Sequence, residues 1–186
     1  MLPPSKEQIT ALLSGGDVRS ISRANEVVAL ISSQELFDTL FSLLLGNDRL
    51  IAMRAADAIE KVSKTKPEWL QSHKQTLLRL SSTSKHIELG WHLAQLLSRL
   101  AWNDRELPQI WQLLHQWVVN PNESKIVRTN ALESLALISL KYNYERANLH
   151  IILKGLSDEA IPSLRARVRK VCKMTGIHIQ TDRADT

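Results

Sequence analysis

The sequence predicts an all-α fold in which about ten helices pair into five hairpins. Apolar residues recur at helical spacing, residues that cap helix N-termini recur along the chain, and no segment alternates as a strand does. The 186 residues include only six glycines and six prolines, few for a chain that turns as often as a small sandwich or barrel. The second helices of the later pairs begin near Asp48, Lys85, Glu123 and Glu159, so the unit repeats every 36 to 38 residues. A repeat of this length with two helices per unit is typical of an α-solenoid.

Capping signals place the starts of five of the expected helices. In each signal a side-chain oxygen accepts a hydrogen bond from an otherwise unpaired N–H group of the first turn. In chain order the signals are Ser5 with Gln8, Ser32 with Glu35, Thr65 with Glu68, Asn103 with Glu106, and Ser157-Asp158. Pro67 suits a first helical turn, while Gly15-Gly16 and Gly46-Asn47 end the helices before them. The expected pairs are residues 5–14 with 18–31, 34–45 with 48–64, 67–81 with 85–100, 104–119 with 123–141, and 144–156 with 159–174.

Two of the second helices show the clearest separation of faces. In residues 48–64 one face is apolar at 3.6-residue spacing, and it contains Ile51, Ala55, Ala58, Ile59 and Val62. The other face of that helix carries Arg54, Asp57, Glu60, Lys61 and Lys64. In residues 85–100 the apolar stripe contains Leu89, Leu93, Leu96, Leu97 and Leu100. The polar residues opposite that stripe are Glu88, His92, Gln95 and Arg99.

The second helices resemble those of HEAT repeats. The stretch Arg54-Ala55-Ala56-Asp57-Ala58-Ile59-Glu60-Lys61-Val62 after Asn47-Asp48 carries the resemblance. Val127-Arg128 followed by residues 131–135 is similar, and residues 163–167 echo the pattern weakly. The helix at 85–100 departs from it, with Gly90-Trp91-His92 where small residues are usual, and the first pair matches only at Arg23-Ala24-Asn25. The resemblance covers about residues 34–174 and implies an armadillo-type, right-handed α-α superhelix, a shape that hosts many tasks.

The net charge of +5 comes from one element. Residues 160–175 contain five basic side chains and no acid, whereas the remainder carries 19 basic and 19 acidic side chains. A basic helix of this kind suits phosphates, acidic lipid headgroups or an acidic protein. It equally suits the polar cap that a last repeat needs. The candidate residues for an anionic partner are Arg165, Arg167, Arg169, Lys170 and Lys173.

The resemblance implies a second candidate surface. In related solenoids the second helices line the inner curve, and their outward side chains bind partners. A groove of mixed charge suits protein recognition better than DNA, for which one sign should dominate. A plain solvated polar face is the alternative interpretation for each residue. The groove residues implied here are Asp57, Glu60, Lys61, Glu88, Trp91, His92, Gln95, Arg99 and Glu133.

Five tryptophans cluster in the middle of the chain: Trp69, Trp91, Trp102, Trp111 and Trp117. Trp91 lies at the edge of its apolar face and is expected to show one side to the groove. For the other four we expect packing between repeats, because aromatic side chains bury large areas. An exposed tryptophan could also stack a base or anchor a partner.

The helix expected at residues 123–141 is apolar almost all round over residues 134–140. Two arrangements fit this composition: enclosure between neighbouring helices, or a partner patch that exposes Leu137 and Leu140. The sequence favours enclosure. Arg128 lies near the apolar face and is expected to pair with a carboxylate or with loop carbonyls of the next repeat.

No catalytic or cofactor motif is present in the sequence. It has no His-Glu-x-x-His, no Walker loop and no Gly-x-Gly-x-x-Gly, and its six histidines are scattered. Its single cysteine, Cys172, falls on an apolar arc and is expected to be an inert core residue. We therefore expect no enzyme activity, no cofactor and no metal.

These observations predict one HEAT-like repeat domain at residues 1–176 and a disordered tail at 177–186. The first residues lack a secretory signal pattern and no apolar run is long enough for a membrane span, so a cytoplasmic location is expected. The predicted function is a non-catalytic protein-interaction or scaffold module that uses the groove. The alternative is nucleic-acid binding, possibly in DNA repair, through the basic C-terminal helix. The partner and the oligomeric state stay open.

Overall fold

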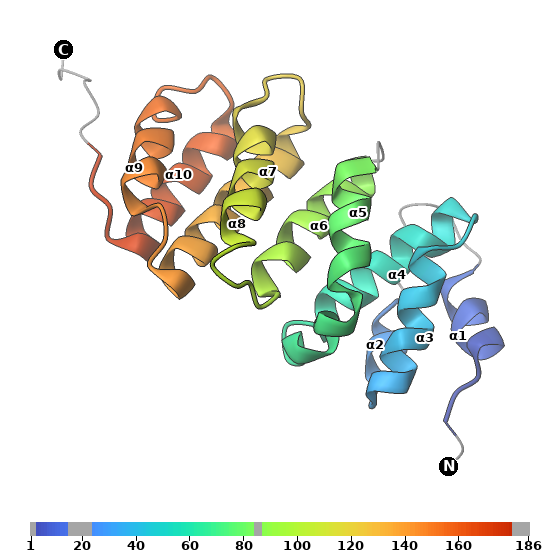
Figure 1. The fold of residues 1–186 in the computed structure, drawn as a ribbon. Coiled ribbons are helices and arrows are strands. Elements are labelled where there is room, and N and C mark those ends of the chain that lie inside the picture. The colour runs from blue at the N-terminus through green and yellow to red at the C-terminus, as the bar shows by residue number, and fades with distance from the viewer. Residues whose placement is uncertain (1–2, 15–23, 84–86, 180–186) are drawn as a thin grey trace. The chain divides into compact units, whose positions relative to one another are not determined.

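The computed structural model describes residues 3–14, 24–83 and 87–179, and every regular element in these ranges is helical (Figure 1). The all-α prediction is therefore confirmed. The chain divides into two compact units, residues 1–101 and 102–186. Whether these units behave as the single predicted domain stays a prediction.

The first unit contains six α-helices and one 3₁₀-helix within its described residues. α3 packs on α4, α4 also contacts α1, α2 and α6, and α5 packs on α6. The chain therefore alternates between a first helix and a second helix that stacks on its counterpart in the next pair. The elements are α1 (Lys6–Leu13), α2 (Ala24–Leu30), α3 (Gln34–Leu44), α4 (Arg49–Val62), η1 (Pro67–His73), α5 (Lys74–Thr83) and α6 (Ile87–Arg99).

The second unit repeats the same plan with four described helices. α7 packs on α8, and α8 packs on α10, the second helix of the last pair. In both units several side-chain hydrogen bonds join residues 34 to 41 positions apart, close to the predicted repeat length. The elements are α7 (Leu107–Val119), α8 (Lys125–Tyr142), α9 (Arg146–Gly155) and α10 (Pro162–Thr175).

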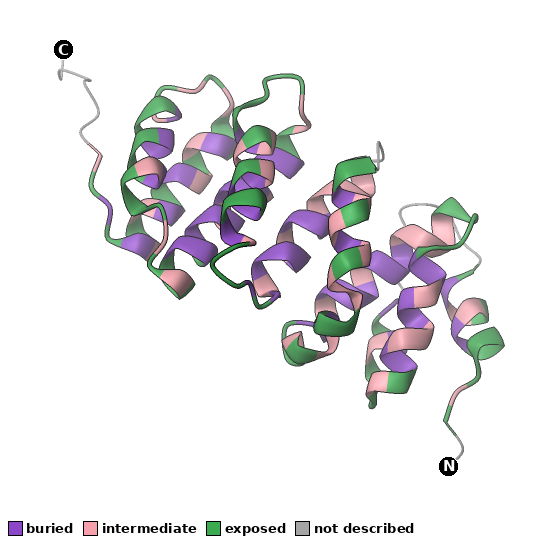
Figure 2. Cartoon of the chain, viewed as in Figure 1, coloured by how far each residue is buried: buried purple, intermediate pink, exposed green. Residues whose placement is uncertain are grey.

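Each unit has its own apolar core, which lies between the paired helices (Figure 2). The predicted apolar faces of α4 and α6 are buried, with two exceptions. Ile51 in the first turn of α4 and Leu89 in the first turn of α6 are only half-buried. Both lie at a helix end, where fewer neighbours cover the predicted face.

The capping prediction is confirmed at the first helix. Ser5 Oγ accepts a hydrogen bond from the Gln8 N–H at 3.3 Å, and Gln8 Oε1 accepts one from the Ser5 N–H at 2.8 Å. The second signal is wrong by one position, because Ser33 rather than Ser32 caps α3. The closing pair Gly15-Gly16 lies outside the described residues.

Three later start signals are wrong in detail. Thr65 donates its hydroxyl hydrogen back to the Val62 carbonyl oxygen, and a 3₁₀-helix without a side-chain cap follows from Pro67. Asn103 and Glu106 do exchange hydrogen bonds, but they form a turn that ends where α7 begins. Ser157-Asp158 does not open α10, which begins instead with Pro162. A proline at the first position needs no N–H partner, so it starts the helix without a side-chain cap.

The last described residues follow α10 directly. Gly176 ends the helix with φ of 67°, a left-handed conformation that glycine adopts without strain. Ile177, the first residue of the predicted tail, is buried, and its N–H donates to Thr175 Oγ1. Residues 180–186 lie outside the described ranges, so the disordered tail stays a prediction.

Candidate functional site: the outward faces of the second helices

Two predicted groove residues form an ion pair between α4 and α6. Arg99 Nη2 donates to Glu60 Oε1 at 2.5 Å, and Arg99 Nη1 donates to the Glu60 carbonyl oxygen and to Ser63 Oγ. The Glu60 side chain is only 5% exposed. Glu60 was expected on the solvent-facing side, and that expectation is wrong. Burial alone would raise the pKa of Glu60, but the hydrogen bonds and charges of Arg99 and, to a smaller extent, Lys64 together outweigh it and lower this pKa.

His92 was also expected on the polar face, and it is buried at the same junction. It is 1% exposed, and no described polar atom pairs with its Nδ1. The Trp91 ring covers it, with the two ring centroids 3.5 Å apart. Loss of hydration is the main cause that lowers the pKa of His92 to about 4. The negative charges of Asp57 and Glu60 act to raise this pKa, and the positive charges of Lys61 and Arg99 act to lower it. His92 is therefore neutral near pH 7 and contributes packing at the helix junction.

The buried histidine predicts a pH-dependent stability. Because the pKa of His92 is depressed on folding, the unfolded chain binds this proton first as the pH falls. The protein should therefore lose up to about 3 kcal/mol of its free energy of unfolding between pH ~6.5 and pH ~4. Urea titrations at several pH values should show this loss, and His92→Leu should reduce it. The matched change His150→Leu, at an exposed histidine on α9, should leave the loss in place; equal slopes for all three proteins would contradict the assignment.

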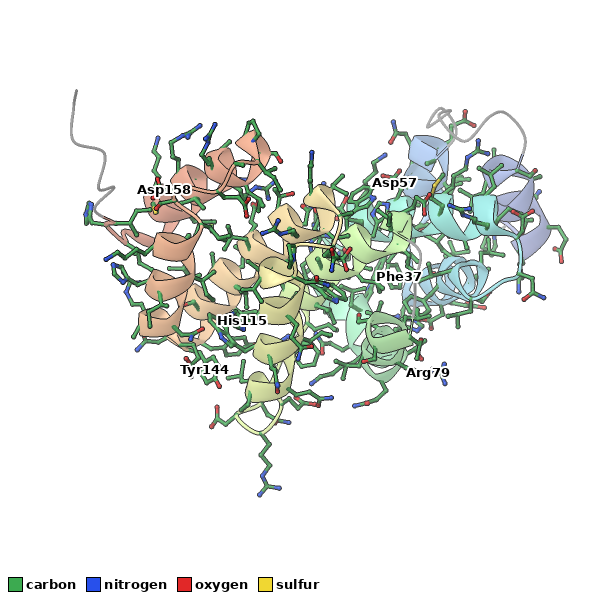
Figure 3. The ribbon with its side chains drawn as sticks, turned by 90° about the horizontal axis from the view of Figure 1, so that it is seen from above. Phe37, Asp57, Arg79, His115, Tyr144 and Asp158 are labelled. Carbon is green, nitrogen blue, oxygen red and sulfur yellow. The ribbon has the colours of Figure 1, made fainter. Side chains whose placement is uncertain are left out.

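The remaining predicted residues of the first unit form a half-exposed surface. Lys61 Nζ donates to Asp57 Oδ2 at 2.7 Å and also to Asn25 Oδ1 on α2. Glu88 on α6 pairs with Arg49 on α4 at 2.6 Å. Side chains along α4, including Asp57, can be followed in Figure 3. We name the half-exposed set the α4–α6 surface, and it consists of Asp57, Lys61, Glu88, Trp91 and Gln95.

A pocket of about 340 Å³ lies beside this surface. It is lined by the end of α3, the starts of α4 and α6, and the end of α5. Leu44, Leu45, Met53 and Leu89 supply apolar walls, and the half-buried Leu89 noted above is one of them. Periodicity within one helix does not reveal this pocket, because its walls come from four different helices.

Two arginines at matching places in the second helices are buried. Arg54 was expected on the polar face of α4, yet it is buried and its Nη1 donates to the Leu13 carbonyl oxygen at 2.7 Å. Arg128 on α8 donates to the Val118 carbonyl oxygen at 2.9 Å and to Glu159 Oε2 at 2.8 Å. The expectation for Arg128 is confirmed. Leu13 and Val118 lie at helix ends, where carbonyl groups lack intrahelical partners and favour positive charge.

In the second unit, two of the five candidate basic residues are bound to a predicted groove residue. Arg167 Nη1 pairs with Glu133 Oε2, and Lys170 Nζ donates to Glu133 Oε1 at 2.7 Å. These bonds join α10 to α8 and neutralise the Glu133 charge. No carboxylate among the described residues pairs with the other three candidates, which are Arg165, Arg169 and Lys173.

The expected enclosure of the apolar stretch of α8 is wrong at two positions. Leu137 is 39% exposed and Leu140 is 44% exposed, while Ser134, Leu135, Ala136 and Ile138 between and before them are buried. A helix that is apolar almost all round can therefore still expose one row of its side chains to solvent. Which residues form that row depends on where the neighbouring helices lie, and periodicity alone does not locate them.

The predicted division of the tryptophans holds except at Trp117, which was expected to pack and is partly exposed, and Trp69 packs but is also only half-buried. Trp69 packs against Phe37 on α3, with ring centroids 5.9 Å apart. Trp111 is buried, donates from Nε1 to Asn148 Oδ1 on α9 and meets the Tyr144 ring edge-on. Trp102 is also buried. Trp91 and Trp117 remain partly exposed.

The described residues include a close His–Asp pair and a single cysteine. His73 Nε2 lies 2.6 Å from Asp38 Oδ1, and the His73 ring stacks on Phe41. This pair comes from two repeats and was not foreseen. Among the described residues no three His, Cys, Asp or Glu side chains gather as metal ligands. Cys172 is partly buried, and loss of hydration raises the pKa of its thiol, which disfavours the reactive thiolate.

The chain was compared with protein families, curated proteins and solved structures. The family profile described as "HEAT repeat domain" matches residues 6–175, which is nearly the whole chain. Neither a curated protein nor a solved structure matches the chain. None of the described helices combines the length and the apolarity needed to cross a bilayer.

Proposed function

Because the chain belongs to the HEAT repeat family, whose repeats generally mediate protein–protein interaction or scaffolding and are typically non-catalytic, we propose that it is a protein-binding module. It holds its partner on the outward faces of its second helices. In the first unit the α4–α6 surface makes this contact, and in the second unit the faces of α8 and α10 do.

The mixed character of the α4–α6 surface is the observation that carries the proposal. Its charges are already paired, Glu88 with Arg49 and Asp57 with Lys61, and the less exposed Asp57–Lys61 pair is the more ordered of the two before a partner binds. Side chains held in place lose little conformational entropy on binding. The same surface includes the half-exposed ring of Trp91, a residue type that often dominates protein interfaces. Glu60, His92 and Arg99 support this surface from beneath.

A differential capture experiment tests the proposed function. The intact chain is immobilised, and the proteins that it retains from cell lysate are quantified beside those retained by Trp91→Ala and by Gln95→Arg. Both changes should lower recovery of the specific partner about tenfold or more, the loss expected for a central interface residue. Gln95→Arg removes no packed aromatic ring, so it separates a lost contact from a disturbed fold. The control is Gln75→Ala, an exposed change on the first helix α5, which should bind like the original chain. Equal recovery from all four proteins would overturn the proposal.

Nucleic-acid binding through α10 is the second candidate. Three basic side chains of α10 have no carboxylate partner among the described residues: Arg165, Arg169 and Lys173. The phosphates of a duplex can pair with them. The triple change to glutamate should leave the helical fold intact and abolish any duplex binding, measured by fluorescence anisotropy at low salt. Tight, salt-sensitive duplex binding by the triple variant would contradict this candidate, and so would the absence of duplex binding by the original chain.

A further inference from the structure

We propose that the second unit binds an acidic amphipathic helix of a partner protein across α8 and α10. This inference rests on the proposed function and specifies the chemistry of the partner. The surface, named the α8–α10 surface, consists of an apolar row on α8 and a basic edge on α10. Its residues are Ile126, Leu137 and Leu140 on α8 and Arg169, Lys170 and Lys173 on α10.

The apolar row occupies the open face of α8. Ile126, Leu137 and Leu140 are 46%, 39% and 44% exposed, whereas almost every other apolar side chain of this helix is buried. Their spacing of eleven and then three residues puts them on one face, together with Glu133. The row is roughly 20 Å long, or about four helical turns. Large aliphatic side chains aligned on one face indicate a contact surface more than scattered exposure does.

The basic edge meets this row at Lys170, whose ammonium group donates to Glu133 within the row. Glu133, the acid within the row, is already bound by Arg167 and Lys170, so it adds no net negative charge. Lys170 nevertheless leaves 58% of its side chain exposed. Arg169 and Lys173 are exposed, and no described carboxylate pairs with them. The sequence of α10 contains no acid. The surface is therefore apolar along one helix and positive along its neighbour.

An acidic amphipathic helix matches both features. Such a helix places apolar residues at i, i+3, i+4 and i+7 against an apolar row and its carboxylates against the flanking cations. Nucleic acid fits less well, because the row has aliphatic side chains where stacking needs aromatic ones. A lipid surface also fits less well, because side chains that are about half-recessed insert little apolar area into a bilayer.

The test is a selection with defined variants. Peptides that bind the intact chain are selected from a displayed library of helix-forming peptides. Those that also bind the double variant Leu137→Gln/Leu140→Gln are then removed. The affinity of each remaining peptide for the intact chain and the variants is measured by fluorescence anisotropy. A second variant, Arg169→Glu/Lys173→Glu, tests the basic edge. The matched control is Ile151→Gln, which removes an aliphatic side chain that is 66% exposed on α9. Circular dichroism verifies that all variants keep the helical fold.

The expected peptides combine acidic residues with apolar residues at helical spacing. Their affinity should fall about tenfold or more in both double variants, weaken with added salt, and stay unchanged in Ile151→Gln. Peptides without acidic residues, peptides that bind all variants equally, or no enriched peptide would overturn the inference. The inference would also be overturned if duplex DNA or phosphatidylserine vesicles bound at this surface more tightly than the peptides. The same holds if sedimentation showed the intact chain to be a dimer and Leu137→Gln/Leu140→Gln to be a monomer. Peptides sensitive only to Gln95→Arg would overturn it while leaving the proposed function standing.

Discussion

Replacing Arg128 by alanine is expected to lower the free energy of unfolding of the second unit by about 3–5 kcal/mol. The Arg128 side chain is only 4% exposed, and it satisfies the Val118 carbonyl oxygen while pairing with Glu159. Its removal leaves a helix-end carbonyl without a donor, a carboxylate without its cation, and a space where the aliphatic stem packed. Each of these losses is destabilising, and here all three occur together.

Urea denaturation followed by circular dichroism measures this loss. Arg128→Lys should recover only part of the stability, because an ammonium group cannot reach the carbonyl and the carboxylate in the same planar geometry. Lys125→Ala, an exposed change on the same helix, should alter the stability by less than about 0.5 kcal/mol. A double-mutant cycle with Glu159→Ala should give a favourable coupling energy. A loss for Arg128→Ala no larger than that for Lys125→Ala would contradict the assigned role.

The helices of this chain were predictable because their signal is local. Apolar spacing and repeat length placed each helix pair, and the described helices overlap the expected ranges. Helix starts were less predictable, as Ser157-Asp158 illustrates. A serine next to an aspartate has the chemistry of a cap, but Pro162 begins α10 four residues later.

The polar face of the second helices was the part that sequence could not resolve. Glu60, His92 and Arg99 all appear polar on a helical wheel, and all three lie largely out of solvent between α4 and α6. Glu60 and Arg99 pair with each other across adjacent repeats, 39 residues apart in the sequence. Periodicity within one helix separates a core side from the other sides, but it does not distinguish solvent from a neighbouring repeat. For the same reason the sequence favoured enclosure of α8 over the alternative in which Leu137 and Leu140 are exposed.

Truncating Glu60 to alanine is expected to destabilise the first unit by about 3 kcal/mol, because it leaves Arg99 without its counter-charge. The Arg99 side chain keeps 18% exposure, so water recovers part of its hydration and the cost falls at the lower end for a broken buried pair. Glu60→Met combined with Arg99→Met should cost less than Glu60→Ala alone, because removing both charges leaves neither of them unpaired. Lys64 also lies beside Glu60, at 3.2 Å, but it is exposed, so Lys64→Ala should cost less than about 1 kcal/mol.

The pH dependence of these variants distinguishes Glu60 from the neighbouring histidine. The pKa of Glu60 is lowered on folding, so its contribution is present above the pKa of the unfolded chain and is lost as the pH falls through the folded value. The original chain should therefore lose this stabilisation below pH ~4, whereas the loss due to His92 is complete by then. Urea titrations of Glu60→Ala should retain the loss between pH ~6.5 and ~4 and show a smaller loss than the original chain below it. Should Glu60→Ala and the original chain lose stability in parallel below pH ~4, the pairing of Glu60 with Arg99 would contribute nothing to folding.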